Sequence, residues 1–278
     1  MEKIQNAIAK ARAERDSTLK TPGNRRRSAA DGFTAAPASG QVSEAWNSLP
    51  ELKVDKKRME NNRIVSFSGG KEASSIDMMR TRILQQTRAN NWRRLAITSG
   101  TADCGKSTIS LNLAFSLSQQ SDFRTILLEM DVRRPSLAGT LGIQEGYNLA
   151  AVLAGSARFE DNASRYGKNL IISTNKGPWH NPAELLHSAN LPKVLAEIEA
   201  TYEPDMVIMD MPPMLVSEDM VAFLGHVDCV LLVAAAEATT IKQIDMCERE
   251  LAAQTNVMGV VLNKCRYMEA EYGYGYYD

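Results

Sequence analysis

The sequence predicts an α/β fold with a mostly parallel β-sheet and helices on both of its faces. Two observations predict this class. Short apolar runs recur from about residue 93 onward without polar alternation, and helical stretches separate most of them. Continuous apolar strands are typical of sheets buried on both faces, and the helices between them supply the crossovers that parallel strands need.

Each element follows from its own residue pattern. Compact apolar runs predict buried strands, whereas apolar residues at intervals of three and four predict helices. In the helix expected after residue 106, for example, Ile109, Leu113 and Leu117 fall on one face. The predicted strands span residues 93–99, 124–131, 169–174, 204–210, 227–236 and 257–263, and the predicted helices span residues 107–120, 190–202 and 239–255.

The composition is that of an ordinary globular protein. The 278 residues are 44% apolar and 23% charged, with a formal net charge of −1. So small a net charge argues against nucleic acid as a partner. Four scattered cysteines without metal-ligand spacing, and no signal peptide, predict reduced thiols in the cytoplasm. No apolar run approaches the roughly 18 residues of a membrane span, so a membrane location would depend on another molecule.

The first sixty residues differ from the rest. Ile4, Ala7, Ile8 and Ala11 have helical spacing and predict a short amphipathic helix. A stretch rich in Ser, Gly, Pro and Ala follows and predicts a flexible linker. The expected organisation is therefore helix and linker over residues 1–60, a nucleotide-binding domain over residues 61–265, and a C-terminal tail over residues 266–278.

A phosphate-binding loop follows the first strong strand. The segment "GTADCGKST" matches G-x-x-x-x-G-K-[ST] and opens a helix, which is the context that the motif requires. Backbone N–H groups at such a helix start surround phosphates, while the lysine neutralises phosphate charge and the serine ligates Mg²⁺. The candidate nucleotide-binding residues here are Gly100, Thr101, Ala102, Asp103, Cys104, Gly105, Lys106, Ser107 and Thr108. Asp103 is unusual because it places a carboxylate inside an anion-binding loop.

Three carboxylates lie where two predicted strands end. Glu129 and Asp131 close one strand two residues apart, and Asp210 closes another. Mg²⁺ prefers oxygen ligands, and a carboxylate near a γ-phosphate can also accept a proton from an attacking hydroxyl. The alternative is that each residue caps its strand or pairs with an arginine such as Arg133.

The C-terminus concentrates the tyrosines. Five of the eight tyrosines are in the last dozen residues, and three of them alternate with glycine. These five are Tyr267, Tyr272, Tyr274, Tyr276 and Tyr277. The pattern alone is equally compatible with a biased tail that has no chemistry and with a tail that is itself a substrate.

Taken together, these motifs resemble the bacterial tyrosine kinases of capsule and exopolysaccharide biosynthesis. That family is a branch of the deviant P-loop ATPases, which include septum-positioning and plasmid-partition proteins. The resemblance covers about residues 65–278 and rests on the phosphate loop, "EMDVRRP", "NPAELL", "DMPP" and the tyrosine tail. It implies a partition-ATPase-like fold, ATP and Mg²⁺ as cofactors, and tail tyrosines that a neighbouring subunit phosphorylates.

The resemblance also assigns residues. Lys106 and Ser107 would bind phosphate and Mg²⁺, and Asp131 and Asp210 would complete the magnesium site. Glu129 takes the place of the family's first aspartate and is a catalytic candidate with a longer reach. Asn263 matches a position that contacts adenine in related ATPases.

The resemblance further implies partners. Family members work with a membrane-spanning polysaccharide chain-length regulator whose cytoplasmic tail activates the kinase, so a cytoplasmic chain recruited to the inner face of the plasma membrane is expected. A homo-oligomer is expected too. The ring-forming helix motif E-x-x-R-x-x-R-T-N is degenerate, however, because the aligned "SSIDMMRTR" keeps only Arg80 and Thr81. The phosphate loop departs as well, with Ala102 and Asp103 in place of Pro-Gly.

Two other functions stay open at this point. A partition-type ATPase switch would hydrolyse ATP without using a tyrosine, but such proteins carry a signature lysine where this chain has Thr101. A degenerate nucleotide-binding scaffold without catalysis is the other alternative, and Asp103 and Glu129 keep it open.

Overall fold

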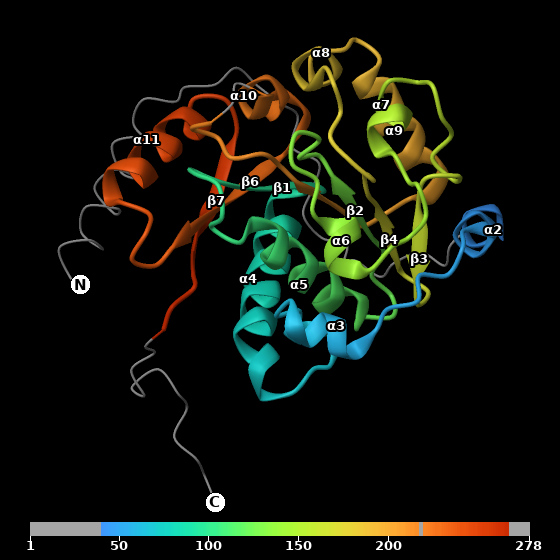
Figure 1. Ribbon diagram of the computed structural model, residues 1–278, viewed down its shortest axis with the longest axis horizontal. Helices are drawn as coiled ribbons and strands as arrows, with labels where there is room; N and C mark the ends of the chain where they lie inside the picture. The colour runs from blue at the N-terminus through green and yellow to red at the C-terminus, as the bar shows by residue number, and fades with distance from the viewer. Residues whose placement is uncertain (1–39, 217–218, 267–278) are drawn as a thin grey trace, which may run out of the picture. The chain divides into compact units, whose positions relative to one another are not determined.

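The computed structural model describes residues 40–216 and 219–266, which belong to one compact unit (Figure 1). Its helices are α2 (Gly40–Ser48), α3 (Lys56–Asn61), α4 (Ser74–Asn90), α5 (Lys106–Ser118), α6 (Leu137–Leu141), α7 (Leu149–Leu153), α8 (Pro182–Leu186), α9 (Leu191–Tyr202), α10 (Asp219–Phe223) and α11 (Ile241–Ala252). Short 3-10 turns lie at Val65–Phe67, Lys71–Ala73 and Leu224–His226. Its strands are β1 (Arg94–Ser99), β2 (Thr125–Glu129), β3 (Ser164–Tyr166), β4 (Leu170–Ser173), β5 (Met206–Asp210), β6 (Cys229–Ala235) and β7 (Asn256–Asn263).

The strands form a single sheet in the order β3-β4-β2-β5-β1-β6-β7. Every neighbouring pair is parallel except β3 and β4, so the predicted fold class is confirmed. In the register, Asp210 of β5 lies opposite Glu129 of β2 on one side and opposite Ile97 of β1 on the other. The carboxyl ends of the three central strands therefore meet at one edge of the sheet.

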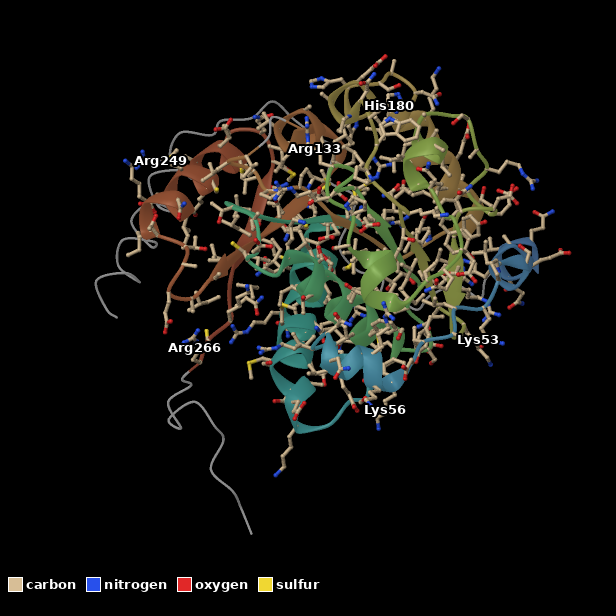
Figure 2. The ribbon with its side chains drawn as sticks, viewed as in Figure 1. Lys53, Lys56, Arg133, His180, Arg249 and Arg266 are labelled. Carbon is tan, nitrogen blue, oxygen red and sulfur yellow. The ribbon has the colours of Figure 1, made fainter. Side chains whose placement is uncertain are left out.

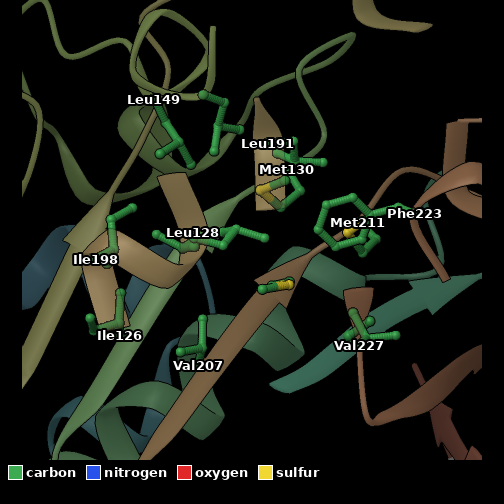
Figure 3. Packing of buried hydrophobic residues seen from close by; sticks show 14 of the residues in the cluster. Ile126, Leu128, Met130, Leu149, Leu191, Ile198, Val207, Met211, Phe223 and Val227 are labelled. Atoms are coloured by element: carbon green, nitrogen blue, oxygen red, sulfur yellow. The ribbon is translucent and has the colours of Figure 1, made fainter. Parts of the chain in front are cut away.

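Helices cover both faces of this sheet and enclose two apolar cores. One core joins the sheet to α2, α7, α8, α9, α10 and α11, and Figure 3 shows its packing around Leu128, Met130 and Phe223. The other core joins the sheet to α3, α4, α5 and α6. Helix α5 is buried nearly all round, with Leu111 and Phe115 covered as completely as Leu113. The predicted helix is thus confirmed, and it is buried well beyond the face that carries Ile109, Leu113 and Leu117.

The folded part of the chain begins earlier than the predicted boundary at residue 60. Trp46 of α2 is only 2% exposed, and its indole N–H donates to the carbonyl of Tyr202 at 2.7 Å. Met59 of α3 is fully buried in the second core. Residues 40–60 therefore pack against the domain instead of serving as linker, because their few apolar residues fill positions at the edge of each core.

Helix α4 uses Arg80, one of the two residues retained from the ring motif, for contacts inside the domain. Asp77 pairs with Arg80 at 3.1 Å, and Arg80 also donates to the carbonyl and the hydroxyl of Ser116 on α5. The Ser116 hydroxyl donates in turn to Asp77 at 2.6 Å. This closed network holds α4 against α5. Within the described ranges, no helix is long and apolar enough to cross a bilayer.

Candidate active site

The phosphate-binding loop lies between β1 and α5 and depends on one glycine. Gly105 has a φ of 88°, a left-handed conformation, and it precedes the first helical residue. A Cβ atom at this position would lie 2.2 Å from the side-chain nitrogen of Asn263. That nitrogen donates to the carbonyl of Cys104 at 2.9 Å. Both the backbone conformation and the contact with β7 therefore require glycine.

Alanine at Gly105 is expected to weaken nucleotide binding at least about tenfold and to lower the melting temperature, because a left-handed conformation and a blocked Cβ both carry a cost. The binding constant for a fluorescent ATP analogue measures this effect. Gly139→Ala is the matched control, since no atom lies within 4 Å of a Cβ there. Equal binding by both variants would contradict the role given to Gly105.

Lys106 lies in a nearly buried ion pair. Its ammonium is 2.7 Å from a carboxylate oxygen of Asp131, whose other oxygen accepts from the backbone N–H of Arg134 at 3.1 Å. Burial alone would lower the pKa of Lys106, but the charges of Asp210 and Asp131 outweigh burial and raise it. Lys106 is thus a permanent cation at the mouth of the loop, where phosphate charge would need to be neutralised.

Asp210 is fully buried beneath the same loop. Its carboxylate accepts from the hydroxyl of Ser107 at 2.6 Å and from that of Ser110 at 3.1 Å. Burial raises the pKa of Asp210, although the charge of Lys106 opposes the shift. Its backbone carbonyl also accepts from the N–H groups of Met130 and Asp131, both at 2.9 Å. Asp210 therefore connects the phosphate-binding loop, through Ser107, to the residues that follow β2.

Glu129 has a different environment from the other two acids. It is fully buried, and one of its oxygens accepts from the backbone N–H groups of Ser136 and Leu137, each at 2.6 Å. The other oxygen accepts from the N–H of Asn175 at 2.7 Å. Burial raises its pKa to about 7, while these three amides oppose the shift. Both oxygens accept backbone hydrogen bonds, so Glu129 holds two loops, and its catalytic role stays a prediction.

Replacing Glu129 with glutamine is expected to reduce the free energy of unfolding by about 1–3 kcal/mol, because an amide NH₂ would face a backbone donor in a buried site. Denaturant unfolding of the two chains measures the difference. Aspartate at this position should be no better, since it is one methylene short of amides on both loops. An unchanged unfolding midpoint in the glutamine variant would contradict the proposal that Glu129 stabilises the fold.

The unusual residue of the loop is exposed to solvent. Asp103 has a φ of 61° and an exposed side chain. Thr101 and Ala102 are partly buried, and the hydroxyl of Ser99 donates to the carbonyl of Thr101 at 2.6 Å. Cys104 is buried, with its sulfur 3.6 Å from the hydroxyl of Thr239. The loop is therefore fixed from inside, and its one carboxylate faces solvent.

The remaining predicted site residues lie at the ends of the loop, on β7 or outside the described residues. Gly100 is buried and Thr108 is partly buried, at the two ends of the motif. Asn263 lies at the end of β7 and supports the loop through Cys104, whereas contact with adenine stays a prediction. The five tail tyrosines lie outside the described residues.

Two residues of the site were missed by sequence reasoning. Ser110 shares Asp210 with Ser107, and it lies one helical turn further along α5. Its position three residues after the motif serine, on the same side of the helix, is the signal that could have found it. Thr98 donates to the carbonyl of Pro212 at 2.7 Å and fixes the "DMPP" segment, which no sequence pattern indicates.

The residues present fit magnesium only together with a nucleotide. Among residues 40–216 and 219–266, no group of three His, Cys, Asp or Glu side chains is arranged to hold a metal ion by itself. Ser107, Asp131 and Asp210 nevertheless gather around Lys106 at the phosphate loop. Mg²⁺ characteristically takes one or two protein ligands and completes its shell with phosphates and water, which suits this donor set.

A strand, a glycine loop and a helix start at the carboxyl edge of a parallel sheet define a P-loop nucleotide-binding protein. Residues 95–271 match the model of the CobQ/CobB/MinD/ParA nucleotide binding domain. The chain belongs to this family and, within it, to the bacterial tyrosine-protein kinases.

Three relatives illustrate the similarity. Tyrosine-protein kinase YwqD of Bacillus subtilis (strain 168) is 30% identical over 223 residues, covering 78% of this chain and 92% of YwqD. Tyrosine-protein kinase CpsD of Streptococcus agalactiae is 30% identical over 190 residues, covering 66% of this chain and 80% of CpsD. The kinase domain of Escherichia coli tyrosine kinase ETK superimposes with a TM-score of 0.64 at 26% identity, covering 82% of this chain and 86% of that domain. The match to full-length Etk covers only 23% of its length.

Proposed function

We propose that the chain is an ATP-dependent tyrosine autokinase that phosphorylates its own C-terminal tyrosine cluster in trans. The observation that carries the proposal is the Lys106–Asp131 ion pair beside Ser107 and Asp210, on a chain that ends in five clustered tyrosines. A buried cation and two carboxylates at a phosphate loop suit phosphoryl transfer, in which positioning and charge stabilisation supply most of the rate.

Each side chain has a separate part in this proposal. The loop N–H groups and Lys106 bind the β- and γ-phosphates, and Ser107, Asp131 and Asp210 hold Mg²⁺. The metal supplies charge stabilisation to the transferring phosphoryl group. Asp210 also orients Ser107 through their 2.6 Å hydrogen bond. Glu129 keeps the loop that follows Asp131 in place.

The cellular setting is part of the same proposal. Family membership supports a role in polysaccharide polymerisation or export and activation by a membrane-spanning chain-length regulator. We infer that this regulator recruits the chain to the inner face of the plasma membrane. Homo-oligomers would bring one chain's tail to another chain's site. Arg80 pairs with Asp77 of its own chain, which counts against a ring whose subunits contact each other through α4.

Phosphate counting by intact mass tests the proposal. After incubation with Mg-ATP and the regulator's cytoplasmic segment, the wild-type chain should gain several phosphates. A variant with phenylalanine at Tyr267, Tyr272, Tyr274, Tyr276 and Tyr277 should gain none and still bind ATP. Tyr147→Phe, in the folded part of the chain, serves as the control. ATP consumption without phosphate on the wild-type chain would instead indicate a partition-type switch.

A further inference from the structure

The last strand of the sheet has a free edge. β7 pairs in parallel with β6, and no described strand pairs with its other side. Val260 and Leu262 on this strand are 44% and 60% exposed. A sheet edge with unpaired N–H and C=O groups and apolar side chains is a template for another strand.

A groove follows this edge between β7 and α4. It has a volume of about 370 Å³ and is lined by Met78, Met79 and Met258, with Ser75, Arg82 and Gln86 among them. Met78 is 50% exposed, whereas Asp77 and Arg80 of the same helix form hydrogen bonds with Ser116 of α5. Methionines beside polar groups suit a side chain with an apolar body and a polar tip, as tyrosine has.

The chain itself supplies such side chains close by. Only Lys264 and Cys265 separate β7 from the tail, and Figure 2 labels Arg266, the last described residue, just beyond β7. Tyr272, Tyr274 and Tyr276 recur at an interval of two, which would place all three on one face of a strand and glycines on the other. Glu271, beside them in sequence, has a charge complementary to Arg82 of the groove.

We propose that residues 270–277 of the same chain add to the free edge of β7 as an antiparallel strand, with Tyr272, Tyr274 and Tyr276 in the α4–β7 groove. The lengths match, since β7 has eight residues and the added segment also has eight. The intervening residues 264–269 are about as long as an ordinary connection. Attachment to β7 also gives the tail a high local concentration.

The added strand would withhold the tyrosines until the tail is released. This consequence rests on the proposed kinase function, whereas the docking itself does not. Phosphorylated tyrosines would be excluded from the methionine-lined groove, because burying their charge is unfavourable. Release would then be favoured once the tail is modified.

Hydrogen exchange of β7, measured by mass spectrometry without ATP, tests the docking. Amides of residues 256–263 that point away from β6 should exchange at least about tenfold more slowly in the full chain than in a chain ending at Met268. The difference should not change with protein concentration. Equal exchange in both chains would overturn the proposal, as would protection that appears only at high concentration, which indicates a second copy at the edge.

Matched variants separate the groove from general effects. Serine at Tyr272, Tyr274 and Tyr276 together should abolish the protection, whereas serine at Tyr277, on the opposite face of the strand, should retain it. Met78→Glu should also abolish it, and Ile241→Glu, at a site that is 72% exposed on α11, should not. Retained protection in the triple variant would exclude the tyrosine face as the docking element. Because no ATP is present, these results do not depend on kinase activity.

Discussion

Replacing Lys106 with methionine should abolish tail phosphorylation, with a loss of at least about a hundredfold in rate. The ammonium is the only lysine nitrogen that the structure places within the described site, 2.7 Å from Asp131. Methionine fills much of the same space but provides no charge for phosphate oxygens. Initial rates of phosphate incorporation, followed by intact mass, measure the effect.

The substitution also removes one partner of a buried pair. Asp131 is only 3% exposed, so the single variant is expected to lose several kcal/mol of unfolding free energy, as is usual when one buried charge is left alone. The double variant Lys106→Met with Asp131→Asn removes both charges and should recover stability without recovering activity. Activity recovered together with stability would mean that Lys106 acts only through the fold.

Replacing Asp210 with asparagine should lower the phosphorylation rate strongly while changing the unfolding free energy less than Lys106→Met does. Asparagine keeps the size of the side chain, and Lys106 retains Asp131 as its ion-pair partner at 2.7 Å. The Ser107 and Ser110 hydroxyls can rotate to keep hydrogen bonds to an amide. We expect a change of less than about 1 kcal/mol in unfolding free energy, within the range of a satisfied hydrogen bond. Phosphorylation should fall at least about a hundredfold, because a charged ligand for Mg²⁺ is lost.

A partly buried aspartate at the other end of the sheet provides the control. Asp228 accepts from the backbone N–H groups of Arg93 and Arg94 at 2.7 and 2.8 Å, at the opposite end of β1 from the phosphate loop. Asp228→Asn is therefore the same chemical change away from the site and should leave the phosphorylation rate within about twofold. If both variants lose activity equally, the loss at Asp210 reflects the fold and not its position at Ser107.

Much of the fold could be predicted because buried parallel strands have a distinctive sequence. Six strands were predicted from apolar runs, and all six are present. β3 was missed because its three residues, Ser164–Tyr166, form no apolar run. Helix α2 was missed because Trp46 and Val42 are its only buried residues, and its place beside Tyr202 depends on contacts distant in sequence.

The candidate site, like the fold, could be predicted only in part from the sequence. Lys106 and Ser107 belong to a local motif whose spacing reflects the loop itself, and the structure brings them to Asp131 and Asp210. The role of Glu129 could not be predicted, since its partners Ser136 and Asn175 lie in loops that only the tertiary structure brings to it. The contact of Asn263 with Cys104 spans 159 positions and was equally inaccessible.

A mixture of two chains tests the central claim most directly. One chain ends at Met268 and keeps the intact site, and the other is full-length Lys106→Met, which keeps the tail. Both are incubated with Mg-ATP and the regulator's cytoplasmic segment and are then resolved by mass. The account predicts several phosphates on the Lys106→Met chain and at most one, on Tyr267, on the truncated chain. ATP consumption with no phosphate on either chain would contradict it.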